Sequence, residues 1–142
     1  MAEGILKEKL KQLAIPAEVD SCGFESFHVG EHPDARAVEI SRRHGIDISG
    51  HTARLFSTRD FQNFDLILVM DTTHYYKIMK LVPDEKNKAK VDFVMNAVFP
   101  GSNKAVPDPW YDDISAFEEV FSLLDFATDR IAGKIASQFQ TP

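Results

Sequence analysis

The sequence contains a single cysteine, Cys22, among its 142 residues. One cysteine excludes an internal disulfide and any metal site built from cysteines alone. No run of apolar residues is long enough to span a membrane, and the N-terminus lacks the hydrophobic segment of a signal peptide. We therefore expect a protein of the reducing cytoplasm that has no membrane partner.

An excess of basic residues is also absent. Lys and Arg number 16 against 22 Asp and Glu, which gives a net charge of −6. A general nucleic-acid-binding protein would show a basic face, so we expect no nucleic-acid partner. The sequence has no repeat and no low-complexity linker, and 44% of it is hydrophobic. Residues 1–142 are therefore predicted to form a single domain with one core.

Hydrophobic periodicity predicts an alternation of helices and strands. Residues 66–70 form a continuous apolar run, which is typical of a parallel strand buried on both faces. Strands are predicted over 17–21, 66–70 and 91–98. Helices are predicted over 2–13, 33–45, about 57–63, 72–81 and from a Ser115–Glu118 capping box onward, with a charged turn over 83–90. This order implies an α/β fold: a parallel sheet with crossover helices on both faces.

Asp108 is the strongest candidate for catalysis because it lies between Pro107 and Pro109 and precedes Trp110 and Tyr111. Proline restricts its own backbone and that of the residue before it, so the carboxyl is held on a stiff, extended segment. An aromatic wall would partly desolvate this carboxyl and suit it to general acid catalysis. The alternative is a proline-rich turn that leads into the last helix.

Three further features are candidates for a site. Phe24 and Phe27 lie along a loop over 22–32 with glycines near both ends, where they could form a binding surface or pack beneath the loop. Asp71 follows the buried strand, at the edge where α/β sheets bind ligands, but the favoured interpretation is that it is a helix cap alone. His51 is a lone loop histidine, which is more often structural than catalytic.

Several motifs together resemble the low-molecular-weight protein tyrosine phosphatases, in order and in approximate spacing. They cover nearly the whole chain, and the family resemblance rests on their combination. The motifs are Met1-Ala2-Glu3-Gly4, Val19-Asp20-Ser21, His28-Val29-Gly30, His44-Gly45-Ile46-Asp47-Ile48-Ser49-Gly50-His51, Asp65-Leu66-Ile67-Leu68-Val69-Met70-Asp71 and Val106-Pro107-Asp108-Pro109-Trp110-Tyr111.

The resemblance implies hydrolysis of a phosphotyrosine protein or a small aryl phosphate through a cysteinyl-phosphate, without metal or cofactor. In the family a cysteine attacks phosphate held by a loop of the form C-x-x-x-x-x-R-[ST]. Asp108 matches the acid that protonates the leaving phenol and then activates water. Trp110 and Tyr111 match the mouth of the pocket, and Phe27 matches its opposite wall. The positions that support or adjoin the phosphate loop are matched by Ser21, His51 and Asp71.

The sequence departs from the family in one large respect, because it contains no C-x-x-x-x-x-R. The family's first strand and phosphate loop directly precede the segment that matches Met1. We therefore expect the sheet to lack this central strand, and we predict no turnover from these residues alone. Cys22 is not a displaced nucleophile, since no arginine follows at the required spacing and no positive neighbour is evident.

Three interpretations remain open. The favoured one is that residues upstream of Met1 are missing, since the first helix has no N-cap residue before it. A second is a truncated relative without catalysis, which closes its sheet by rearrangement or by borrowing a strand. The third is a catalytically dead, phosphatase-like binding protein that uses the aromatic mouth. An arsenate reductase-like relative is a weaker enzyme alternative, because that chemistry relies on additional cysteines. Asp112 and Asp113 stand where the family commonly has a glycine pair, so we expect weaker binding of acidic phosphopeptides.

Overall fold

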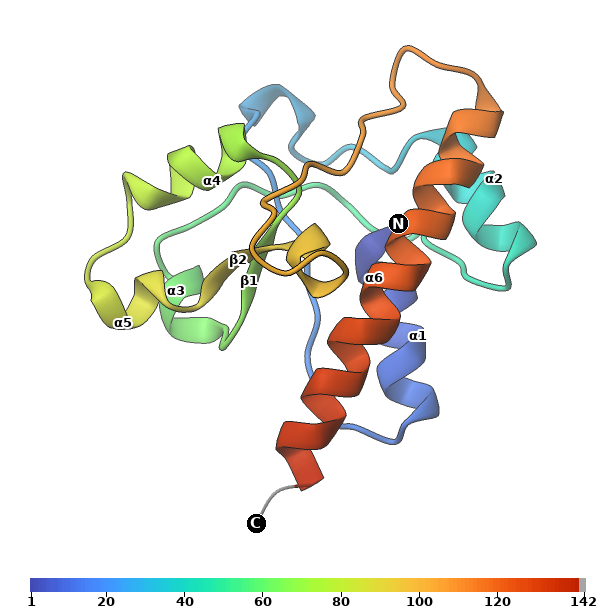
Figure 1. The fold of residues 1–142 in the computed structure, drawn as a ribbon. Coiled ribbons are helices and arrows are strands. Elements are labelled where there is room, and N and C mark those ends of the chain that lie inside the picture. The colour runs from blue at the N-terminus through green and yellow to red at the C-terminus, as the bar shows by residue number, and fades with distance from the viewer. Residues whose placement is uncertain (141–142) are drawn as a thin grey trace.

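A computed structural model describes residues 1–140, with Phe27 and Gln140 described by their backbone only. Among the described elements, helices alone precede residue 67, and helices and strands alternate only from there onward (Figure 1). The elements are α1 (Ala2–Gln12), the 3-10 helix η1 (Ser26–His28), α2 (Ala35–Arg43), α3 (Asp60–Asn63), β1 (Ile67–Val69), α4 (Thr72–Met79), α5 (Glu85–Lys88), β2 (Val91–Phe93), the 3-10 helix η2 (Val94–Ala97) and α6 (Ile114–Gln140).

The sheet consists of β1 and β2, which pair in parallel with Ile67 opposite Val91. Helices α4 and α5 form the crossover between them. Alternate side chains of a strand point to opposite faces. Leu68 accordingly packs into a core with α1, α2 and α6, whereas Ile67 and Val69 pack into a core with Phe61 of α3 and with α4. The predicted α/β fold with a parallel sheet and helices on both faces is therefore confirmed.

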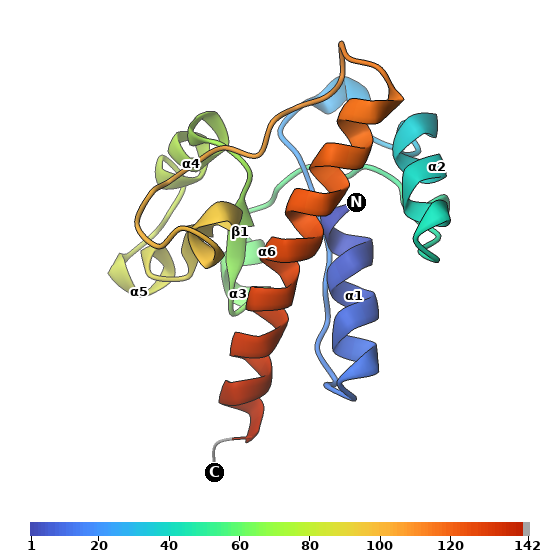
Figure 2. The ribbon, with the colours of Figure 1, turned by 45° about the vertical axis from the view of Figure 1, so that its right-hand side comes forward.

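The strand predicted over 17–21 was wrong. This segment is extended and runs alongside β1 (Figure 1, Figure 2), but nearby strand pairing is limited to one parallel bridge between Gly23 and Leu55. A strand exists only where a neighbour completes its hydrogen bonds. Because the Ile67 N–H points to Lys90 O, the backbone groups of Leu68 point to the opposite edge of β1. Among the described residues, no strand pairs with that edge.

The second half of the strand predicted over 91–98 was also wrong, because β2 ends at Phe93 and η2 follows. The carboxylate of Asp92 accepts hydrogen bonds from the Phe93 N–H at 2.8 Å and from the Asn96 side chain at 2.7 Å. Asn96 also bonds to Asn103 at 2.8 Å. These side-chain bonds offer the backbone an alternative to the strand ladder, and the chain therefore turns away from the sheet.

Side-chain caps account for two other differences. The charged turn predicted over 83–90 contains α5, because the Asp84 carboxylate accepts the Asn87 N–H at 2.8 Å. The long helix starts at Ile114 and not at the predicted capping box. Asp113 accepts the Ser115 N–H at 3.0 Å, which is the contact an N-cap residue makes. Asp113 therefore stabilises the start of α6.

The core is formed mainly by α6 and α1, which lie side by side in both views (Figure 1, Figure 2). Phe117, Val120, Phe121, Leu124 and Ile131 of α6 are buried, and they pack in one cluster with Ile5 of α1 and Ile40 of α2. Each such side chain contributes about 1.5–3 kcal/mol through removal from water. Among the described residues, no helix combines the length and the apolar character that a membrane crossing requires.

Candidate functional site

Two predicted site segments meet at the carboxyl end of β1. The Met70 carbonyl, just after the strand, accepts the N–H of Val106 at 2.8 Å. This bond ties the segment that carries Asp108 to the end of the strand, next to Asp71. In Figure 1 the start of α4 and the orange 104–113 segment lie towards the same end of the sheet. The carboxyl ends of parallel strands are where open α/β folds bind their ligands.

Asp71 acts as the N-cap of α4. Its carboxylate accepts the His74 N–H at 2.9 Å, and the His74 ring nitrogen lies 3.4 Å away. The capping interpretation is therefore confirmed, and the carboxylate is held at the start of a helix beside the Asp108 segment.

Asp108 is exposed, and its carboxylate accepts the Trp110 N–H at 3.1 Å. The partial desolvation expected from the sequence is absent because the aromatic residues point outward: Trp110 is 52% exposed and Tyr111 is 96% exposed. The prediction that an aromatic wall desolvates the Asp108 carboxyl was therefore wrong. The carboxyl is nevertheless held by its own turn and is accessible to a substrate.

Ser21 and His51 meet at the first turn of α1. The Ser21 hydroxyl donates to Glu3 at 3.2 Å and lies 3.3 Å from Nε2 of His51. Nδ1 of His51 lies 3.5 Å from the other oxygen of Glu3. Glu3 therefore joins two residues that the sequence singled out separately, although sequence reasoning gave it no role. The only sequence signal for Glu3 was its position in the first turn of a predicted helix, where a negative charge interacts favourably with the helix dipole.

Arg54 lies next to this group, and the sequence had not indicated it as a site residue. Its Nε donates to Asp20 at 2.8 Å, and its two terminal nitrogens donate to the Asp60 carboxylate at 3.1 Å each. Desolvation would raise the pKa of Asp20, but the bond from Arg54 and the Ser21 N–H together lower it. A pocket of about 510 Å³ lies against these groups, lined by Glu3, Asp20, His51 and Arg54 among others. Arg54 is committed to two carboxylates and is not free to bind an anion.

Glu3, Asp20 and His51 are also the group of described residues that could offer ligands to a metal ion. Their potential ligand atoms lie within 4.8 Å of one another. Each residue is already engaged: Glu3 and His51 contact Ser21, and Asp20 is bound by Arg54.

Cys22 lies beside Arg54, so the statement that it has no positive neighbour was wrong. Cys22 is exposed at the surface, but neighbouring protein atoms partly desolvate the thiol. This desolvation raises the pKa of Cys22 to about 11, with Arg54 opposing the shift and Asp60 and Asp20 reinforcing it. A thiol with this pKa is almost entirely neutral at physiological pH and is therefore a poor nucleophile.

The two loop aromatics have different outcomes. Phe24 stacks at centroid distances of 5.5 Å from Phe56 and 5.6 Å from His74, so for this residue packing beneath the loop is confirmed. Phe27 belongs to η1, and its side chain lies outside the described side chains.

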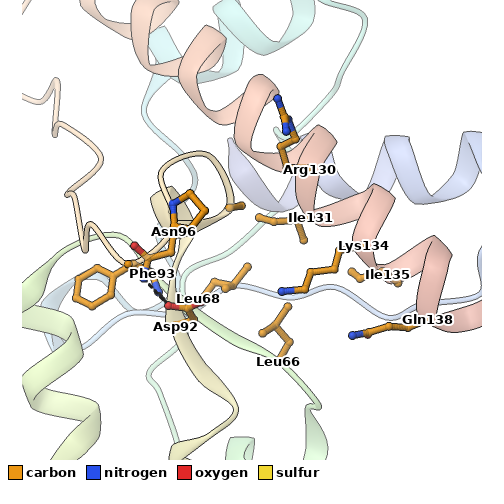
Figure 3. A pocket seen from close by; sticks show the side chains of 13 residues that line it. Leu66, Leu68, Asp92, Phe93, Asn96, Arg130, Ile131, Lys134, Ile135 and Gln138 are labelled. Carbon is orange, nitrogen blue, oxygen red and sulfur yellow. Dashed lines mark hydrogen bonds between the residues drawn. The ribbon is translucent and has the colours of Figure 1, made fainter.

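A second pocket, of about 530 Å³, lies between the sheet and α6. Figure 3 shows Leu66 and Leu68 on the sheet side and Ile131, Lys134 and Ile135 on α6. None of the predicted site residues lines this pocket. Its lining combines these apolar side chains with polar ones, among them Asp92, Arg130 and Lys134.

Comparisons with known proteins show the family of this chain. The family profile described as low molecular weight phosphotyrosine protein phosphatase matches residues 1–141. A phosphatase of that name from Schizosaccharomyces pombe is 35% identical over 131 residues, which is 89% of this chain and 83% of that protein.

Solved structures resemble the fold closely. A protein tyrosine phosphatase from Entamoeba histolytica superposes with a TM-score of 0.88 at 27% identity, covering 96% of this chain and 88% of that one. YfkJ from Bacillus subtilis superposes with a TM-score of 0.85 at 29% identity, covering 98% and 87%.

Proposed function

This chain belongs to the low molecular weight phosphotyrosine protein phosphatase family, and we propose that its substrates are those of a tyrosine phosphatase: a phosphotyrosine protein or a small aryl phosphate. We propose residues 1–142 as one domain in which Asp108 is the general acid and base. The single observation that carries this proposal is the accessible Asp108 on a segment bonded to the carboxyl end of β1.

The other site residues are proposed in supporting roles. Trp110 and Tyr111, exposed beside Asp108, would contact the aromatic ring of a substrate, and Phe27 would contact it from the opposite wall. Ser21, His51 and Asp71 would support the phosphate-binding region. No metal or cofactor takes part in this chemistry. The single cysteine favours the reducing cytoplasm as the proposed location.

We further propose that these 142 residues have no turnover by themselves. A positioned general acid supplies about 10²–10⁴-fold of rate, which is a small part of the ~10⁶-fold or greater acceleration typical of enzymes. The remainder requires an activated nucleophile and donors to the phosphoryl oxygens. The only cysteine present has a raised pKa, and Arg54 is held by two carboxylates.

The experiment is an assay of residues 1–142 on a small aryl phosphate, with Asp108→Ala as the matched variant and Cys22→Ser as the control for the thiol. We expect no turnover from any of the three proteins. Turnover that disappears in Asp108→Ala would disprove the inactivity of these residues and would support Asp108 as the acid.

A phosphatase-like binding protein is the second candidate, and the exposure of Trp110 and Tyr111 favours it. Such a protein would capture a partner whether or not the partner is phosphorylated. Capture would survive Asp108→Ala and be lost in Trp110→Ala. An arsenate reductase-like relative is the weaker enzyme alternative, since Cys22 is the only cysteine.

A further inference from the structure

Among the described residues, one side chain from outside residues 108–112 forms hydrogen bonds to this stretch, which carries Asp108. Nη1 of Arg36, on α2, donates to the Asp112 carbonyl at 2.6 Å, and Nη2 donates to the Trp110 carbonyl at 3.0 Å. The other hydrogen bonds of residues 108–112 are internal: Trp110 N–H to Asp108, and Asp112 N–H to the Pro109 carbonyl. Within residues 1–140, Arg36 is therefore the only outside donor to this stretch.

The same guanidinium is anchored on its other side. Nε and Nη2 form a fork with the Asp34 carboxylate, at 3.0 and 2.9 Å. The guanidinium carbon lies 4.4 Å from the ring centroid of Phe117, which is buried in the first turns of α6. Nε, Nη1 and both hydrogens of Nη2 thus have acceptors, and a flat ring supports one face of the group.

Asp34 connects the Arg36 guanidinium to the loop that carries Phe24 and Phe27. Its carboxylate accepts the Arg36 N–H at 2.8 Å and caps α2, at the point where the loop that carries Phe27 ends. The hydrogen bond from the Arg36 side chain is the largest influence on this carboxylate, and it lowers the pKa of Asp34 against the effect of desolvation. One guanidinium therefore joins the end of the 22–34 loop to the carbonyls of the 108–112 loop.

We propose that Arg36 is a positioning residue: it holds the Asp108 loop at a set distance and angle from α2. The consequence for catalysis rests on the proposed function, because the direction of the Asp108 carboxyl matters only if Asp108 is the general acid. The positional role of Arg36 does not depend on the proposed function. Lysine could not replace Arg36, since an ammonium group lacks the planar fork that reaches a carboxylate and two carbonyls together.

An ordinary surface ion pair is the competing interpretation, and such pairs add little to stability. The Asp34 contact taken alone fits it, because the two residues are two positions apart. The contacts with the two carbonyls do not fit a surface ion pair. Trp110 and Asp112 lie 74 and 76 positions further along the chain than Arg36, and a carbonyl carries no net charge. A surface pair predicts no change in the loop when Arg36 is replaced, whereas the positioning role predicts a local change.

The test uses Trp110, the only tryptophan, as a reporter within the loop. The variants are Arg36→Lys and Arg36→Ala, read by tryptophan fluorescence anisotropy, acrylamide quenching and amide hydrogen exchange over 108–113. Loss of charge-assisted hydrogen bonds should accelerate exchange in this segment about tenfold, and Lys should not restore it. Anisotropy should fall and quenching should rise in both variants.

The matched control is Arg43→Ala on the same helix, where the arginine pairs only with Glu39 at 2.7 Å on the surface. It should leave the Trp110 signals unchanged. Asp34→Asn keeps an acceptor for the helix cap but weakens the fork, so it should give an intermediate change. If Arg36→Ala does not fold, Arg36→Lys and Asp34→Asn decide the question.

Unchanged anisotropy and exchange in a folded Arg36→Lys or Arg36→Ala protein would overturn the proposal, as would full rescue by Lys. These readouts need no phosphatase turnover. A failure here therefore leaves the proposed function standing, and an inactive protein leaves the role of Arg36 standing.

Discussion

Two parts of the candidate site are held in different ways. The cluster at the first turn of α1, which we call the α1 cluster (Glu3, Asp20, Ser21, His51, Arg54 and Asp60), is partly buried and bonded within itself at nearly every polar atom. The Asp108 loop (residues 107–113) is exposed, stiffened by prolines and attached through Arg36.

This difference matches what each part would do. Groups that support a binding region act by staying in place, so mutual hydrogen bonds and ion pairs suit them. A general acid must approach a substrate that arrives from solvent, so its loop remains accessible and is fixed by few contacts. The comparison predicts that stability depends on the α1 cluster and depends little on the Asp108 loop.

The largest expected effect is that of Arg54→Ala. Asp60 is only 6% exposed, and removing its cation would leave a nearly buried carboxylate that keeps the hydrogen bond from the Ser57 N–H at 2.9 Å but has lost both bonds from Arg54. We expect the free energy of unfolding to fall by about 2–3 kcal/mol, discounted from a fully buried pair because Arg54 is partly exposed. Urea denaturation measures this loss. The control Arg59→Ala, at an exposed arginine beside α3, should change stability by less than about 0.5 kcal/mol. Equal effects would contradict the comparison.

Cys22 offers a chemical test of the cluster's surroundings. With a pKa raised from 9.0 to about 11, its thiolate fraction near neutral pH should be about 100-fold below that of an ordinary thiol. Alkylation by iodoacetamide should therefore be slow and should accelerate about tenfold per pH unit up to about pH 10. The same protein unfolded in urea is the control. Equal rates in both states would mean that the thiol is not desolvated.

The pH dependence of Asp20 gives a smaller effect. Its folded pKa lies below the unfolded value, so its bond to Arg54 stabilises the protein above about pH 4 and is lost as the pH falls through the folded pKa. Asp20→Asn should therefore cost about 1 kcal/mol or less near neutral pH and almost nothing in strong acid, since the side chain is partly exposed. Urea midpoints measured at several pH values test this. A cost independent of pH would rule out the charge as its cause.

The smallest expected effect is that of Asp108→Ala. The substitution removes one exposed turn contact, so stability should change by less than about 0.5 kcal/mol. Urea denaturation of Asp108→Ala and Arg54→Ala under the same conditions compares the two losses of stability directly. A loss as large as that of Arg54→Ala would show that the Asp108 loop is part of the stable framework and would break the comparison.

The sequence predicted best those structural features that depend on residues close together along the chain. The helices α1 and α6 follow from apolar periodicity, and α4 with its Asp71 cap follows from the place of Asp71 before Thr72. The strand over 17–21 failed because strand formation needs a partner elsewhere in the chain, and β2 ended early because Asp92 and Asn96 bond locally. The roles of Arg36 and Arg54 could not be predicted, since an arginine's acceptors are set by the path of the chain.

By itself, the sequence determined the helix faces that become buried, the family to which the chain belongs and the presence of a single thiol. Each of these depends on composition or on local order along the chain. Only the tertiary structure brought Ser21 to His51 across 30 positions, directed Arg36 to Trp110 and Asp112, and placed Arg54 near Cys22. Hydrogen bonds and desolvation depend on distances between remote segments, and those distances exist only once the helices and strands have packed together.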